Sequence, residues 1–304
     1  MKNTTIGLIV LAVLALAIGA YWMMMPTDNL ALNKGPVPTL APVPTAVGNP
    51  AVQNPIDLTK SVLGKSVEGR DIVAYHYGEG ATELLFVGGI HGGYEWNTVL
   101  LAREAMNYFK ANPNVIPKNI KVTIVPVLNP DGLIKVVGTM DQFTKADVSK
   151  SQEKVVSGRF NSNNVDLGRN FDCDWQASGK WQNKTVSGGS TVFSEPESIA
   201  FKKYIETAKP QAVVFWYSAV GGVFSSNCHN GILPETRTLT NTYAKASGYK
   251  AYEEFNFYEI TGDVVNWLAK INIPAISVLL TTHEDVEWNN NWLGIEAVLK
   301  HYSK

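Results

Sequence analysis

The chain has 304 residues, and its 26 basic and 27 acidic residues give a formal net charge of −1 at pH 7. This balance gives no electrostatic basis for binding nucleic acid or an anionic surface, and we expect no nucleic-acid partner. The length of the chain allows one large α/β domain after an N-terminal segment.

An uncharged apolar run at 6–25 opens the chain, and its length is that of a helix crossing a bilayer. Lys2 precedes the run, which favours a cytoplasmic start and an exported body. We therefore expect 1–25 to be a membrane anchor, which makes the membrane a partner and places the rest of the protein on the extracellular face. A cleaved signal peptide, which would make the protein secreted, is the alternative.

The composition changes at 26–56, where prolines are interleaved with Ala, Val, Thr and Asn. The prolines are Pro26, Pro36, Pro38, Pro42, Pro44, Pro50 and Pro55. Such a stretch buries no core, and we expect an extended, semi-rigid linker. Residues 57–304 form the expected domain, without an internal repeat or a second linker.

Within this domain, apolar runs rich in β-branched residues alternate with helical patterns. In chain order we predict strands at 72–76 and 84–88, a helix at 96–109, a strand at 121–127, a turn at 129–132, a helix at 195–208, a strand at 212–217, helices at 237–247 and 262–270, a strand at 275–280 and a helix at 293–302. This alternation predicts an α/β fold with a central mixed sheet flanked by helices on both faces.

Polar or otherwise distinctive residues fall at or just past four of these predicted strands. They are His91, Asn129, Tyr217 and Leu279. Sites in such sheets assemble at the carboxyl ends of strands, so we expect these positions to share one site. The chain also has two cysteines, Cys173 and Cys228, which in an exported protein indicate a disulfide; two buried thiols are the alternative.

Six motifs occur in a fixed order along the domain. They read GIHGGYEW at 89–96, NPDG at 129–132, VDLGRNFDCDW at 165–175, FWYSAVGG at 215–222, FYEITGD at 257–263 and ISVLLTTHE at 276–284. Together they resemble the carboxypeptidase A-like family of zinc metallocarboxypeptidases, from about Leu63 to about Leu293. The resemblance implies a twisted sheet of about eight strands and one catalytic zinc ion.

On this resemblance, His91 and Glu95 are the first two zinc ligands, although His-x-x-x-Glu is one residue longer than the usual family spacing. Without the resemblance, His91 is a capping or core histidine and Glu95 a first-turn carboxylate that complements the helix dipole. Asp166 matches the carboxylate that orients the first zinc histidine; otherwise it stabilises a turn.

The resemblance also implies residues that bind the end of a peptide. Arg169, followed by Asn170, matches the segment that binds the substrate's terminal carboxylate, and Tyr258 matches the tyrosine that closes over it. Arg159 matches the arginine that polarises the scissile carbonyl. Asp263 lies where the family builds its side-chain pocket, where an acid would favour a basic terminal residue; a helix-capping Asp is the alternative.

Three positions depart from the family pattern. Tyr217 stands in place of the third zinc ligand, a histidine, and Leu279 stands in place of the glutamate that acts as general base. Gly168 replaces an asparagine that precedes the carboxylate-binding arginine. A phenol is a poor zinc ligand and a leucine transfers no proton, so both central tasks are affected.

We therefore expect an exported domain that recognises peptide C-termini. The family reaction is zinc-dependent hydrolytic release of the C-terminal residue, and here we expect weak or absent zinc binding and weak or lost activity. The alternative is a pseudopeptidase that binds peptide or cell-wall stem termini without cleaving them.

Overall fold

A computed structural model of the chain describes residues 60–304. The helices are α2 (Trp96–Ala111), α3 (Pro130–Val137), α4 (Gln152–Ser157), α5 (Pro196–Ala208), α6 (Pro234–Ser247), α7 (Val264–Lys270) and α8 (Trp288–Tyr302). The strands are β1 (Lys60–Lys65), β2 (Asp71–Tyr77), β3 (Thr82–Val87), β4 (Ile120–Val125), β5 (Ser178–Trp181), β6 (Lys184–Ser187), β7 (Ala212–Ser218), β8 (Gly222–Ser225), β9 (Lys250–Tyr252) and β10 (Ala275–Leu280).

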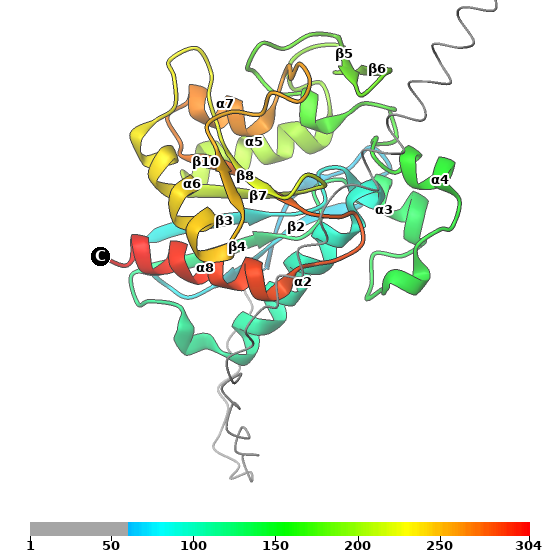
Figure 1. Ribbon diagram of the computed structural model, residues 1–304. Helices are drawn as coiled ribbons and strands as arrows, with labels where there is room; N and C mark the ends of the chain where they lie inside the picture. The colour runs from blue at the N-terminus through cyan, green and yellow to red at the C-terminus, as the bar shows by residue number, and fades with distance from the viewer. Residues whose placement is uncertain (1–59) are drawn as a thin grey trace, which may run out of the picture. The chain divides into compact units, whose positions relative to one another are not determined.

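A mixed, eight-stranded sheet in the order β1-β2-β4-β3-β7-β10-β8-β9 forms the centre of the fold (Figure 1). Its middle strands β4, β3, β7 and β10 are parallel. The pairs β1–β2, β2–β4 and β10–β8 are antiparallel, and β8 pairs in parallel with β9. The predicted α/β class with a central mixed sheet is confirmed.

Helices cover both faces of the sheet. On one face, α2, α6 and α8 pack on alternate strand residues such as Phe86 and Trp216. On the other, α5 and α7 pack on the intervening residues, which include Phe215, Tyr217 and Leu279. Because side chains alternate along a strand, the same strands supply both cores, and Tyr217 and Leu279 share the face of α5 and α7.

The register of the two central strands brings these two residues side by side. β7 and β10 run parallel, and Tyr217 pairs directly with Leu279. The two residues expected to stand in place of a zinc ligand and of the general base are therefore neighbours in the sheet.

One predicted turn is instead the start of a helix. The structure begins α3 at Pro130, and the Asn129 side chain accepts a hydrogen bond of 2.8 Å from the Gly132 backbone N–H. Asn is a favoured N-cap and Pro a favoured first residue, so the prediction of a turn at 129–132 missed a capped helix.

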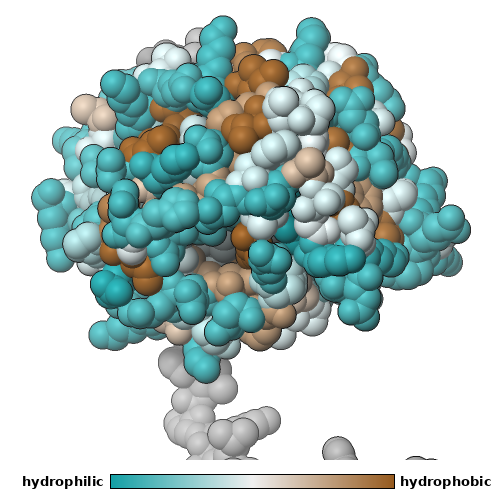
Figure 2. Space-filling view, turned by 90° about the horizontal axis from the view of Figure 1, so that it is seen from above, coloured by the Kyte–Doolittle hydropathy of each residue, from teal (hydrophilic) through white to brown (hydrophobic). Residues whose placement is uncertain are grey.

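The predicted anchor at 1–25 and linker at 26–56 lie outside the described residues, as does the predicted domain boundary at 57. Within 60–304, no helix has the length and apolar character needed to span a bilayer. The surface in Figure 2 is largely hydrophilic, with apolar groups interspersed among polar ones.

Candidate functional site

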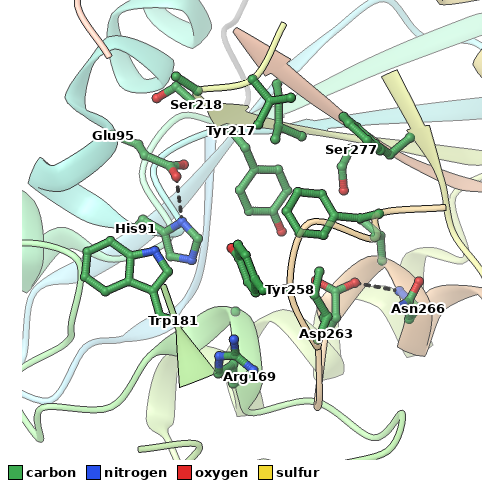
Figure 3. A pocket seen from close by; sticks show the side chains of 18 of the residues that line it. His91, Glu95, Arg169, Trp181, Tyr217, Ser218, Tyr258, Asp263, Asn266 and Ser277 are labelled. Atoms are coloured by element: carbon green, nitrogen blue, oxygen red, sulfur yellow. Dashed lines mark hydrogen bonds and ion pairs between the residues drawn. The ribbon is translucent and has the colours of Figure 1, made fainter. Parts of the chain in front are cut away.

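A cavity of about 490 Å³ opens where the central strands end. Most of the residues predicted for the site line it: His91, Glu95, Arg159, Gly168, Arg169, Tyr217, Tyr258, Asp263 and Leu279. Figure 3 shows those that it labels, His91, Glu95, Arg169, Tyr217, Tyr258 and Asp263, converging from separate loops and strands. Of the four positions expected to share one site, His91, Tyr217 and Leu279 line the cavity, but Asn129 does not, because its side chain caps α3.

The glycine-rich turn after β3 positions His91 and Glu95. Gly92 has a φ of +44°, and a Cβ on it would lie 2.7 Å from the Gly158 carbonyl oxygen. Only glycine fits at this close approach of the two backbone segments. The turn brings His91 Nδ1 within 2.8 Å of Glu95 Oε1. Both side chains are almost fully buried.

Asp166 lies behind His91 rather than in the cavity wall. Its Oδ1 is 3.3 Å from His91 Nε2, and its Oδ2 accepts two hydrogen bonds from Arg159, at 3.0 Å from Nε and 2.9 Å from Nη2. Burial alone would raise the pKa of Asp166, but the charge of Arg159 and the contact with His91 hold it well below its usual range.

Arg159 also reaches the other nitrogen of the histidine. Its Nη1 lies 3.2 Å from His91 Nδ1, and its guanidinium lies over the Trp181 ring at 4.5 Å. Burial and Arg159 oppose protonation of the imidazole, yet Glu95 and Asp166 outweigh them and raise the pKa of His91. His91 Nδ1, the nitrogen expected to face a metal, is thus already in contact with the Glu95 carboxylate and the Arg159 guanidinium.

Tyr217 occupies the third corner of the expected metal site. Its ring centroid is 5.5 Å from that of His91, and its buried hydroxyl has no hydrogen-bond partner among the described residues. Burial raises the pKa of the Tyr217 phenol well above its usual value. The hydroxyl is therefore neutral at pH 7, which is the form that binds zinc poorly.

The residues present do not fit the zinc site that the family implies. Among the described residues, Glu95 Oε2 is buried without a hydrogen-bond partner, so this oxygen is free for a cation. His91 and Glu95 are zinc ligands of the usual kinds, but Tyr217 is not. Across residues 60–304, only one group of three His, Cys, Asp or Glu has ligand atoms close together, and it consists of Asp174 and the two disulfide-bonded cysteines. A zinc site of three protein ligands is not assembled.

Gly168 lies so close to His91 that a side chain would not fit without a shift. A Cβ at this position would lie 2.9 Å from His91 Nε2 and 3.5 Å from Asp166 Oδ1. Any side chain here would press on the contact between His91 and Asp166. The glycine thus removes an amide from the cavity wall and relieves crowding beside the histidine.

Arg169 is buried and held by backbone carbonyls. Its Nη2 donates to the carbonyl oxygens of Lys180 and Glu259, and its Nη1 donates to Thr261 Oγ1 at 3.2 Å. Its Nε has no hydrogen-bond partner within residues 60–304 and lies 3.6 Å from Asp166 Oδ2. These contacts fix the guanidinium plane at the cavity wall.

Tyr258 and Asp263 come from the loop that ends at α7. The Tyr258 ring lies 5.9 Å from the Arg169 guanidinium, so the two flank the same part of the cavity. Asp263 both lines the cavity and caps α7, accepting a hydrogen bond of 3.0 Å from the Asn266 N–H. Burial raises the pKa of the Asp263 carboxyl to about 6.

Asn170 does not reach the cavity, although it was predicted to bind substrate. Its Nδ2 donates to the carbonyl oxygens of Gly188 and Thr191, and its Oδ1 accepts from Ser198 Oγ at 2.6 Å. Because these contacts use its amide within the protein, Asn170 supports the loop behind Arg169.

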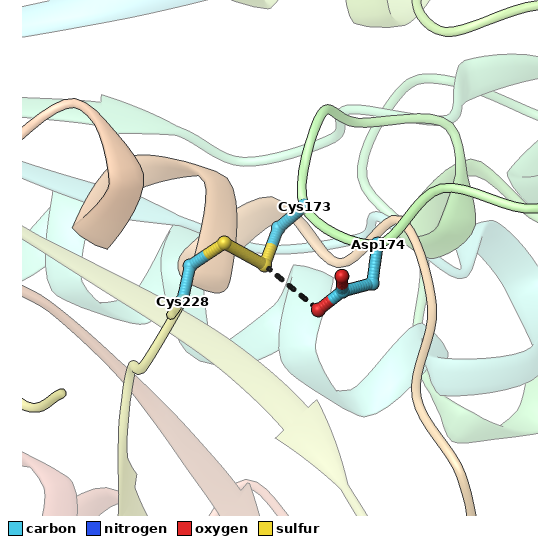
Figure 4. A group of neighbouring side chains, drawn as sticks. All are labelled: Cys173, Asp174 and Cys228. Carbon is cyan, nitrogen blue, oxygen red and sulfur yellow. Dashed lines mark hydrogen bonds between the residues drawn. A yellow bond between two sulfur atoms is a disulfide. The ribbon is translucent and has the colours of Figure 1, made fainter. Parts of the chain in front are cut away.

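Cys173 and Cys228 form a disulfide in the structure (Figure 4). It joins the segment that follows Arg169 to the loop that follows β8. The Gly262 N–H donates to the Cys173 carbonyl at 2.7 Å, and the Phe171 N–H donates to the Gly262 carbonyl at 2.9 Å. The segment that bears Arg169 is therefore tied to both neighbouring loops.

The sequence does not point to Trp181 or Ser277, and at His283 it favours an ordinary loop residue over a replacement for a zinc ligand or the general base. Trp181 lies on the β5–β6 hairpin and packs edge-on against Tyr94, with ring centroids 5.1 Å apart. Ser277 and His283 also line the cavity. His283 lies four positions after Leu279, a spacing visible in the sequence, but only the path of the intervening loop brings it inward.

Comparison with known proteins gives a consistent result. Residues 50–267 match the peptidase M14 family, described as zinc carboxypeptidase. The chain is 27% identical over 199 residues to a zinc carboxypeptidase of Simulium vittatum, covering 63% of this chain and 61% of that protein. It is 23% identical over 216 residues to gamma-D-glutamyl-L-diamino acid endopeptidase 1 of Lysinibacillus sphaericus, covering 64% of this chain and 54% of that protein.

Solved structures share the fold. A carboxypeptidase A from Helicoverpa armigera superposes with a TM-score of 0.63 at 20% identity, covering 81% of this chain and 68% of that one. A murein-tripeptide amidase from Escherichia coli O157 superposes with a TM-score of 0.55 at 20% identity, covering 79% of this chain and 90% of that one.

The chain spans roughly half to three fifths of the length of the first two relatives described above. The family match covers well over half of the chain and includes the segments that bear His91, Arg169 and Tyr258. The fold of its structural neighbours agrees with the sheet described above. This chain belongs to the zinc carboxypeptidase family.

Proposed function

We propose that this protein is an exported member of the zinc carboxypeptidase family that binds peptide C-termini and hydrolyses them weakly or not at all. The observation that carries the proposal is the pairing of Tyr217 with Leu279 on adjacent parallel strands at the cavity. A phenol and an alkyl side chain stand where a metal ligand and a proton-transferring carboxylate are expected.

The chemical consequence is loss of hydrolysis. A positioned acid–base group contributes about 10²–10⁴ in rate, and Leu279 cannot take a proton from an attacking water. The expected metal site lacks its third conventional ligand. The two losses act on the same step, so we propose that little turnover remains.

Recognition of a peptide end rests on different residues, which are present. Arg169 presents a buried guanidinium at the cavity wall, and Tyr258 lies beside it. A guanidinium suits a carboxylate because its hydrogen bonds are charge-assisted, and the Nε proton and one Nη1 proton of Arg169 have no partner among the described residues. Asp263 at the inner wall is an acid that would pair with an amino group on the terminal side chain.

The class of peptide is proposed from the relatives. One relative is named an endopeptidase for gamma-D-glutamyl-L-diamino acid bonds, and one structural neighbour is named a murein-tripeptide amidase. A peptide stem of the cell wall that ends in a diamino acid would offer both a carboxylate for Arg169 and an amino group for Asp263. The apolar run at 6–25, read as an anchor, would place the domain on the outer face of the membrane.

The test is to measure binding of a fluorescent peptide with a free C-terminus and of its C-terminal amide to the purified full chain. We expect the acid to bind about 10- to 100-fold more tightly, since a hydrogen bond to a charged group contributes about 1.5–3 kcal/mol. Arg169→Lys, which keeps the charge and removes the planar fork, should reduce this preference. Arg237→Lys is the matched control, because Arg237 is exposed and pairs with Glu253. Equal binding of acid and amide by the wild type would refute the proposal.

A further inference from the structure

The loop after β10 bends into the cavity and brings His283 to its wall. His283 lines the cavity, is half-buried, and packs against Tyr94 with ring centroids 4.7 Å apart. The position has no counterpart among the family positions identified above. Its surroundings nevertheless determine which nitrogen of its ring carries the proton.

The hydrogen bonds that determine the proton position begin at Asn97 on α2. Its Nδ2 lies 2.8 Å from the Thr282 carbonyl oxygen and 3.0 Å from the Asp285 carbonyl oxygen. Carbonyl oxygens only accept hydrogen bonds, so the NH₂ group of the amide must face them and Oδ1 must face the other way. The side chain of Asn97 thus holds the loop and has one defined orientation.

The next contact is with Ser218 at the end of β7. Its Oγ lies 3.0 Å from Asn97 Oδ1, an acceptor, so the single hydroxyl proton of Ser218 is directed to Asn97. Ser218 Oγ also lies 2.9 Å from His283 Nδ1. Because the hydroxyl proton is already used, Ser218 must accept here, and the proton lies on His283 Nδ1.

The remaining nitrogen of the ring is therefore an acceptor. A neutral imidazole with its proton on Nδ1 carries a lone pair on Nε2. No hydrogen bond to Nε2 is formed by any residue in 60–304, and Nε2 is not among the buried polar atoms that lack a partner, so it is open to the cavity or solvent. Burial lowers the pKa of His283, which favours the neutral ring at pH 7; Glu95 opposes this effect, and His91 and Arg159 support it.

We propose that His283 is a ligand-binding residue whose Nε2 accepts a hydrogen bond from a backbone N–H of a peptide bound through its terminal carboxylate to Arg169. The inference rests on the proposed function for the position of the peptide. In Figure 3, Ser218 and Arg169 lie at opposite edges of the view, with His91 and Tyr258 between them. Because His283 contacts Ser218, it lies on the other side of His91 and Tyr258 from Arg169, where the residues before the last one of such a peptide would lie.

The tautomer is tested without any ligand. Long-range ¹H–¹⁵N NMR spectra of the full chain distinguish protonated from unprotonated ring nitrogens, and the spectrum of His283→Phe assigns the signal among five histidines. We expect His283 with its proton on Nδ1 and a bare Nε2 at pH 7.5. A proton on Nε2 would overturn the inference.

The hydrogen bond is tested with N-acetyl-trialanine and analogues in which one amide N–H at a time is replaced by an ester oxygen. For the wild type, one ester should bind about two- to twelvefold more weakly than the amide, as expected for one neutral hydrogen bond. In His283→Ala, and in His283→Phe, which keeps the packing on Tyr94, that difference should vanish. Glu284→Ala, an exposed neighbour that pairs with Lys145, should keep it.

Identical ester effects in wild type and His283→Ala would contradict the inference even if the free C-terminus is bound. Loss of the preference for acid over amide would instead contradict the proposed function, and the tautomer would still report on His283. The two failures are therefore distinguishable.

Discussion

At the scale of single residues, the site is organised around the buried carboxylate of Asp166. It contacts His91 on one side and accepts two hydrogen bonds from the buried Arg159 on the other. Since an unpaired buried charge is costly, this carboxylate stabilises the folded protein as well as orienting the histidine. It lies beside His91, where the family resemblance implies a carboxylate.

We predict that Asp166→Asn lowers the free energy of unfolding by about 3–5 kcal/mol, because it leaves Arg159 buried without its counter-charge. Asp172→Asn is the control, since Asp172 forms an exposed pair with Lys270 and should cost less than about 1 kcal/mol. Urea unfolding at pH 7 measures both. Equal effects of the two substitutions would show that Asp166 is not the charge that balances Arg159.

Asp263 makes the stability of the folded protein depend on pH with the opposite sign to that expected for a carboxylate in a stabilising ion pair. Its native pKa of about 6 lies above the value of about 3.9 for an unfolded Asp. Between these values the native protein binds more protons than the unfolded chain, so this group lowers stability as the pH rises from about 4 to 6.

Asp263→Asn should therefore raise the free energy of unfolding by about 1–3 kcal/mol at pH 7.5 and change it little at pH 4. Asn remains a good N-cap for α7, so the helix start should be preserved. Urea unfolding at the two pH values tests this. A variant less stable than the wild type at pH 7.5 would contradict the assignment of a raised pKa.

At the scale of elements, the register of strands β7 and β10 sets which side chains stand at the expected ligand and base positions. Their register places Tyr217 beside Leu279, and both face the cavity. Replacing them together should restore the two missing groups without moving the strands.

We predict that Tyr217→His with Leu279→Glu increases zinc affinity and releases C-terminal residues from peptides faster than the wild type, by at least the factor of about 10² that an acid–base group contributes. Bound zinc and released amino acids are measured on the same preparation. Trp216→Phe with Val278→Ile, on the opposite face of the same strands, is the control for disturbance of the sheet. A folded double variant without either gain would refute the residue assignments.

The disulfide belongs to the same scale, since it ties the Arg169 segment to the loop after β8. We predict that Cys173→Ser with Cys228→Ser lowers the free energy of unfolding by about 2–5 kcal/mol, the usual cost of losing a native disulfide. The variant should be insensitive to reductant, while the wild type should lose stability in dithiothreitol. No difference between reduced and oxidised wild type would exclude a stabilising role.

Across the whole molecule, the long periodic elements were predictable because each has one apolar face or one buried run. The short strands β5, β6, β8 and β9 were not, since three or four residues carry no periodicity and their pairing depends on distant partners. The helix α3 was missed because its Asn-Pro start also reads as a turn.

The candidate site was predictable in part for a related reason. Residues in local motifs, such as His91, Glu95 and Arg169, line the cavity as expected. Trp181 and His283 reach it only through the paths of a hairpin and a loop, which the sequence does not encode locally. Asn170 sits within a motif, yet the loop turns its side chain inward.

The central claim is that this family member binds peptide ends without an intact metal-dependent reaction. The most direct measurement combines three readings on the purified full chain: zinc per chain, binding of a peptide with a free C-terminus, and release of its terminal residue. We predict less than stoichiometric zinc, binding that requires the free carboxylate, and little or no release. One tightly bound zinc per chain with rapid release of the terminal residue would contradict it.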